Sequence, residues 1–80
     1  MLRLKFTNSE GVFEYLTHFD MTDGELRGFS SSEDSSGALK FFSHALANLV
    51  GTQAVRDSIK AANPDDYCPL IKYETENYYA

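Results

Sequence analysis

The first third of the chain alternates apolar and polar residues around two turn signals. Asn8-Ser9-Glu10-Gly11 is typical of a four-residue turn, and Asp23-Gly24 of a two-residue type I′ turn with positive φ at both residues. These turns predict a meander of three antiparallel strands. In the first hairpin Lys5 lies opposite Glu14, an opposite-charge pair that contributes about 0.2–1 kcal/mol.

The second hairpin adds another charge pair, Asp20 opposite Arg27. Because side chains alternate along a strand, this register gives the sheet one apolar and one polar face, and a one-residue slip would exchange them. We expect the apolar face to form the core with Leu2, Leu4, Phe6, Phe13, Tyr15, Phe19, Met21 and Leu26. The polar face carries Arg3, Lys5, Glu14, His18, Asp20, Glu25 and Arg27, with Val12, Leu16 and Phe29 as apolar exceptions.

The segment from Ser9 to Asp20 has an alternative as a helix, with Val12, Leu16 and Phe19 on one side. Gly11 in its first turn and its aromatic and β-branched residues favour strands instead. We therefore adopt the strand interpretation and keep the helix as the alternative.

Apolar residues from Gly37 to Val50 repeat with helical spacing. The stripe expected to face the sheet contains Leu39, Phe42, Leu46 and Leu49. The helix is expected to start between Ser32 and Ser36 and to end at Gly51. Thr52 then caps a shorter second helix with Val55, Ile59 and Ala62 inward, which ends before Asn63-Pro64.

Residues Pro69 to Tyr79 predict a last, edge strand, in which Ile71, Tyr73 and Thr75 alternate with Lys72, Glu74 and Glu76. The predicted fold is a single small α+β domain over residues 1–80. Its order is β-β-β-α-α-β, a three-stranded antiparallel meander followed by two helices and a C-terminal strand. The long helix covers one face of the sheet.

Composition and charge limit the class of protein. The 80 residues carry 7 Lys+Arg and 12 Asp+Glu, a net charge of −5, and 42% are hydrophobic, as in an ordinary folded domain. No stretch is apolar and long enough to span a membrane, and the first residues do not resemble a signal peptide. The one cysteine excludes an internal disulfide, so we expect a cytoplasmic protein.

No motif indicates reaction chemistry. Cys68, His18 and His44 show no metal-ligand spacing, and the glycines form no phosphate-binding loop. We therefore expect no metal, no cofactor and no enzyme activity. Direct nucleic-acid binding is not expected either, because the chain is acidic and its aromatic residues are assigned to the core face.

Acidic pairs and a tyrosine-rich end are the candidate partner-binding features. Carboxylates imitate phosphates electrostatically, and tyrosine beside Glu and Asn is typical of protein-binding surfaces. A helix terminus, a turn, a solvated face and a chain end would explain the same residues without a partner. The predicted partner-binding residues are Glu33, Asp34, Asp65, Asp66, Glu74, Glu76, Tyr78 and Tyr79.

The predicted function is a non-enzymatic acidic protein-binding module. It would be an inhibitor or regulator that docks on a basic partner surface, with nucleic-acid mimicry as one form of docking. By analogy of class, such small acidic chains resemble phage- or plasmid-borne proteins that block a host complex in anti-defence. The alternative is a structural or assembly subunit that forms a homodimer or larger homo-oligomer through the sheet edge.

Overall fold

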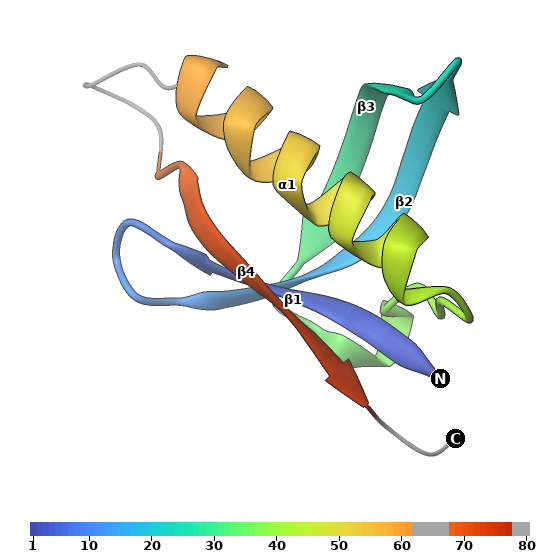
Figure 1. The fold of residues 1–80 in the computed structure, drawn as a ribbon. Coiled ribbons are helices and arrows are strands. Elements are labelled where there is room, and N and C mark those ends of the chain that lie inside the picture. The colour runs from blue at the N-terminus through green and yellow to red at the C-terminus, as the bar shows by residue number, and fades with distance from the viewer. Residues whose placement is uncertain (62–67, 78–80) are drawn as a thin grey trace.

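Four strands and one α-helix form the part of the chain that the structure, a computed structural model, describes: residues 1–61 and 68–77. Along the chain these are β1 (Leu2–Asn8), β2 (Phe13–Thr22), β3 (Glu25–Ser32), the short 3-10 helix η1 (Ser35–Gly37), α1 (His44–Ala61) and β4 (Leu70–Asn77). All neighbouring strands are antiparallel and lie in the order β3-β2-β1-β4, with α1 across one face (Figure 1). The α+β class, the three-stranded start and the last edge strand are confirmed.

The β1–β2 turn is one residue shorter than predicted. The Asn8 side-chain oxygen accepts hydrogen bonds from the backbone N–H groups of Glu10 and Val12, and the Asn8 N–H donates to the Val12 carbonyl at 2.9 Å. Gly11 has φ 81°, which glycine adopts without strain. The loop is therefore residues 9–11, closed by Asn8 and Val12, because loop length sets the register of a hairpin.

This shorter turn shifts β2 by one residue against β1. Lys5 lies opposite Tyr15, and Phe13 lies opposite Thr7, so the predicted Lys5–Glu14 pair is wrong. The shift exchanges the faces of the first half of β2. Phe13 and Tyr15 were predicted in the core and lie on the opposite face, whereas Leu16 is fully buried.

Two further register shifts restore much of the predicted core. In β2, Leu16 pairs with Ser31 and His18 with Ser30, so Thr17 is the extra residue, as in a β-bulge. Leu16 and Phe19 therefore both contribute to the core. Leu2, Leu4, Phe6 and Leu26 are buried as predicted, Met21 packs against them, and Phe29 joins them from its predicted polar face.

The β2–β3 turn has the predicted geometry, since Asp23 and Gly24 both have positive φ. The pair Met21 and Leu26 also forms as expected. Arg27 is an extra residue in β3, however, so Asp20 pairs with Gly28 and the predicted Asp20–Arg27 pairing is wrong.

One continuous helix replaces the two that were predicted. Gly51 lies in its middle, where a Cβ atom would come within 2.6 Å of the Tyr73 ring. The glycine therefore allows α1 to approach β4 closely, and neither it nor Thr52 marks a helix boundary. The helix starts at His44 and not between Ser32 and Ser36, and the Ser43 hydroxyl accepts a hydrogen bond from the Leu46 N–H.

The face of α1 that packs on the sheet consists mostly of small residues. Ala47, Val50, Gly51 and Ala54 are buried, which brings the helix close to the sheet. The predicted inward stripe is wrong at Phe42, Leu46 and Leu49, which are exposed. Ile59 and Ile71, also predicted to alternate or turn inward, are about half exposed. Three other predicted residues do pack against the core: Leu39, Val55 and Tyr73.

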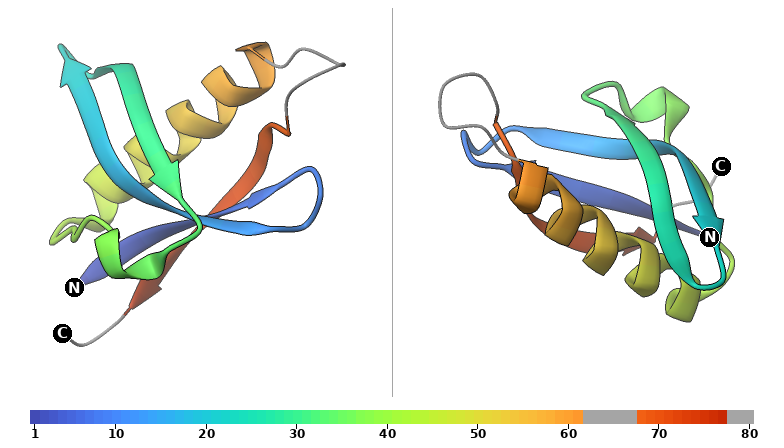
Figure 2. Two further views of the ribbon diagram at one scale, coloured as in Figure 1. Left: turned by 180° about the vertical axis from the view of Figure 1, so that it is seen from behind. Right: turned by 90° about the horizontal axis from the view of Figure 1, so that it is seen from above.

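Two polar side chains attach α1 to both edges of the sheet. The Gln53 side chain accepts a hydrogen bond from the Leu26 N–H and donates one to the Gly24 carbonyl, both at 2.8 Å. The Ser58 hydroxyl accepts a hydrogen bond from the Leu70 N–H at 2.8 Å. The helix thus bridges β3 and β4, and the sheet curves around it (Figure 2).

Candidate protein-binding surface

The face of the sheet opposite α1 carries charged and aromatic side chains from three adjacent strands. These residues alternate along β1 with the buried Leu2, Leu4 and Phe6, which places them on the other side of the sheet. We call this surface the open face; it consists of Arg3, Lys5 and Thr7 from β1, Phe13 and Tyr15 from β2, and Lys72, Glu74 and Glu76 from β4.

Ion pairs join β1 to β4 across the open face. Glu76 lies opposite Arg3 in the register, and their charged atoms are 2.6 Å apart. The Lys5 ammonium lies 3.6 Å from a carboxylate oxygen of Glu74 and 3.6 Å from one of Glu76. The side chains of Arg3 and Lys5 are mostly covered, so water screens these pairs less than it screens freely exposed pairs.

The same two cations cover aromatic rings of β2. The Lys5 ammonium lies 3.9 Å from the centre of the Phe13 ring, and the Arg3 guanidinium carbon lies 4.8 Å from the centre of the Tyr15 ring. Such contacts contribute roughly 0.5–1 kcal/mol at exposed sites. Each cation therefore bridges an aromatic residue of β2 and a carboxylate of β4.

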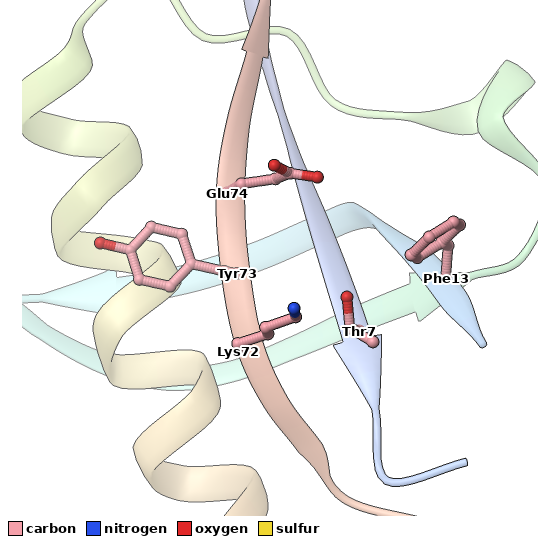
Figure 3. A pocket seen from close by; sticks show the side chains of 5 residues that line it. All are labelled: Thr7, Phe13, Lys72, Tyr73 and Glu74. Carbon is pink, nitrogen blue, oxygen red and sulfur yellow. The ribbon is translucent and has the colours of Figure 1, made fainter. Parts of the chain in front are cut away.

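A hollow of about 250 Å³ opens beside these pairs, lined by Thr7, Phe13, Lys72, Tyr73 and Glu74. Figure 3 shows the Tyr73 ring pointing from β4 toward the helix, while Thr7 and Phe13 lie on the other side of the strand. Lys72 forms no ion pair with any residue of the described ranges. The lining of the hollow thus combines an ammonium, a hydroxyl, a carboxylate and two aromatic rings.

The structure separates the predicted acidic residues. Glu74 and Glu76 lie on the open face, already paired with cations. Glu33 and Asp34 follow β3, at the opposite edge of the sheet, which is roughly 14 Å away over three strand spacings. Asp65, Asp66, Tyr78 and Tyr79 lie outside the described residues.

Asp34 caps the short helix η1 and not α1, the helix predicted to begin beside it. Its carboxylate accepts a hydrogen bond from the Ser36 N–H at 2.9 Å. This bond, with a further one from the Ser36 side chain, lowers the pKa of Asp34. The charge of Asp34 therefore has a local structural role in addition to any role in binding.

The potentially reactive side chains do not meet in the structure. The Cys68 thiol donates a hydrogen bond to the Glu10 carboxylate at 2.9 Å, which raises the pKa of the thiol. His44 starts α1, whereas Leu70, two residues after Cys68, is hydrogen-bonded to Ser58, roughly 21 Å further along the helix. His18 lies in the second half of β2, where it pairs with Ser30 of β3. Glu10 lies in the β1–β2 turn, before the start of β2.

Within residues 1–61 and 68–77, no three His, Cys, Asp or Glu side chains gather closely enough to hold a metal ion. In those same ranges, no helix combines the length and the apolar character needed to cross a bilayer.

Phe13 and Tyr15 are the surface residues that sequence reasoning missed. The sequence of the β1–β2 turn could have predicted their position on the open face. Asn8 followed by Gly11 also fits a three-residue loop with glycine in the left-handed region, and that loop places Leu16 in the core.

Comparison with known proteins found no matching family model, no similar curated protein and no similar solved structure.

Proposed function

We propose that this chain is a non-enzymatic protein-binding module, an inhibitor or regulator that docks on a basic partner through its open face. Such a role is typical of small phage- or plasmid-borne proteins that block a host complex. The observation that carries the proposal is the composition of the open face. It presents Phe13, about half exposed, beside Tyr15 and Arg3, and these residue types are enriched where proteins bind each other.

The interior supports a surface function. The three buried polar side chains among the described residues all hold the fold together: Asn8 closes the β1–β2 turn, while Gln53 and Ser58 attach α1 to the two edge strands. Each is hydrogen-bonded, as buried polar groups need to be. These three buried side chains thus stabilise the fold. The described polar side chains that are free to bind a partner lie on the surface.

Charge affects the proposed binding in two ways, at long distance and at contact. The net charge of −5 attracts a basic partner from a distance and speeds association. At contact, the open face offers three cations and two carboxylates, mostly paired with each other. The proposal therefore relies on aromatic contact for affinity, and it does not include nucleic-acid mimicry by Glu74 and Glu76.

Exposed rings on a sheet also occur in RNA-binding proteins, where bases stack on them. In this chain the cations of Lys5 and Arg3 lie over the rings of Phe13 and Tyr15 and occupy one face of each. Together with the net charge of −5, this arrangement favours a protein over a nucleic acid as the partner.

The test is quantitative affinity capture from a lysate of the source cells, with matched variants. Phe13→Ser removes an open-face ring that is 49% exposed, and Ile59→Ser is its control on α1 at 51% exposure. We expect a protein that the parent chain and Ile59→Ser retain and that Phe13→Ser loses by about tenfold. Equal capture by both variants would contradict the proposal.

The alternative, a homo-oligomer through the last strand, has one observation in its favour. β4 is an edge strand, and two copies paired antiparallel around Tyr73 would place Lys72 of each opposite Glu74 of the other. Light scattering after size exclusion tests it. The alternative predicts a dimer that Lys72→Glu dissociates, whereas the protein-binding proposal predicts a monomer at every concentration.

A further inference from the structure

A groove of about 390 Å³ runs between β3 and the C-terminal half of α1, on the other side of the sheet from the open face. Its walls are Arg27, Gly28, Phe29 and Ser31 from β3 and Asp57 and Ser58 from α1. Figure 2 shows that α1 crosses the sheet at an angle and that its last turns diverge from β3. We call it the β3–α1 groove.

The groove follows a free strand edge. β3 pairs with β2 on one side, and on its other side no described strand is its neighbour. An edge of this kind presents backbone N–H and C=O groups to any extended chain that reaches it. α1 forms the opposite wall of the groove, through Asp57 and Ser58.

Gln53 already binds this edge as a neighbouring strand would. Its side-chain amide accepts from the Leu26 N–H and donates to the Gly24 carbonyl, the pattern that one residue of an added strand makes. Phe29 and Ser31 share the core-facing side of β3 with Leu26, because Arg27 is the extra residue of the register shift. By strand alternation their N–H and C=O groups also point away from β2, into the groove.

The charged side chains that line the groove indicate which charge a bound ligand should carry. Arg27 is exposed and forms no ion pair with any residue that the structure describes. Asp57, on the opposite wall, is held by Arg56 at 3.1 Å. The charge available to a ligand is therefore the Arg27 guanidinium, which binds a carboxylate in a bidentate manner, and the half-buried Phe29 offers an apolar contact beside it.

We propose that the β3–α1 groove binds an extended peptide of a partner protein, which adds to β3 as a fifth strand of the sheet. An acidic side chain of the peptide pairs with Arg27, and an apolar side chain contacts Phe29. Gln53 closes one end of the groove and sets where the added strand begins. This site is separate from the open face, so it does not depend on the function proposed above.

The experiment selects ligands from a library of random twelve-residue peptides displayed on phage and measures their affinity for the full chain by fluorescence polarisation. We expect selected peptides to place an acidic residue next to an apolar one. Arg27→Glu should weaken binding by about tenfold or more. Lys60→Glu makes the same charge change on exposed α1 surface that does not line the groove, and it should leave affinity unchanged.

Amide hydrogen exchange distinguishes strand addition from other docking. The proposal predicts that a bound peptide slows exchange of the Phe29 and Ser31 N–H groups, because they become hydrogen-bonded to it. Unchanged exchange at both amides overturns the proposal, as do affinities equal in Arg27→Glu and the parent chain. Failure to select any peptide overturns it too, and so does a dimer that Arg27→Glu dissociates, which would make a second copy the occupant.

Discussion

At the residue scale, Gly51 shows how one tertiary contact reverses a local preference. In an isolated helix, alanine would be more favourable than glycine by about 1 kcal/mol. In this fold a Cβ atom at position 51 would lie 2.6–2.8 Å from three carbons of the Tyr73 ring. The close contact between α1 and β4 therefore requires the absence of a side chain.

We predict that Gly51→Ala lowers the free energy of unfolding by about 1–3 kcal/mol, since the ring or the helix must move. Urea denaturation followed by circular dichroism measures this change. Gly28→Ala is the control, because nothing lies within 4 Å of the Cβ atom it would add. A stability gain in Gly51→Ala would mean that the helix does not approach β4 as described.

Cys68 provides a second test at this scale, through its pH dependence. The hydrogen bond to Glu10 raises the pKa of the thiol, so the thiolate forms only at a higher pH than in an unstructured peptide. The rate of alkylation by iodoacetamide should therefore rise with pH later than for a free thiol. Glu10→Ala should shift that profile to lower pH, and an identical profile in both proteins would count against the contact.

At the element scale, the β1–β2 turn decides the character of the open face. Asn8 is almost fully buried and accepts two backbone hydrogen bonds, from Glu10 and Val12. We predict that Asn8→Ala destabilises the fold by about 1–3 kcal/mol, because these donors lose their partner. Thermal unfolding measures the effect, with the exposed Ser9→Ala as a control that should change little. Equal stability of the two variants would show that the Asn8 side chain does not hold the turn.

How far the sequence predicts these elements depends on whether the signal is local. Asp23-Gly24 demands positive φ at both residues, so its turn was predictable. Asn8 to Gly11 fits two loop lengths, and the choice between them is made by the packing of Leu16 in the core. Gly51 has the local character of a helix end, and only its contact with Tyr73 explains its place in mid-helix.

The candidate surface was predictable only in part for a related reason. Glu74 and Glu76 stand out along the chain as an acidic pair, but their neutralisation by Lys5 and Arg3 follows from β4 lying next to β1. Strand order is a property of the whole sheet and leaves no local pattern. The groove likewise depends on the angle of α1, which no short segment of sequence encodes.

At the scale of the whole molecule, α1 bridges both edges of the sheet and leaves two surfaces for binding, the open face and the β3–α1 groove. The net charge of −5 acts on both from a distance. We predict that raising ionic strength from about 0.01 M to about 0.1 M, which shortens the screening length from about 30 Å to about 10 Å, slows association with the captured partner. Dissociation, governed by aromatic contact, should change much less. Surface plasmon resonance separates the two rates, and an association rate independent of salt would exclude a basic partner.

The register of β1 against β2 in solution decides whether the proposed binding surface exists, because the open face has its aromatic residues only in that register. Two-dimensional nuclear Overhauser spectroscopy reports close Hα–Hα contacts between residues paired across antiparallel strands. The register described above predicts such contacts between Lys5 and Tyr15 and between Thr7 and Phe13. Contacts of Lys5 with Glu14 would instead return Phe13 to the core and contradict the proposed binding surface.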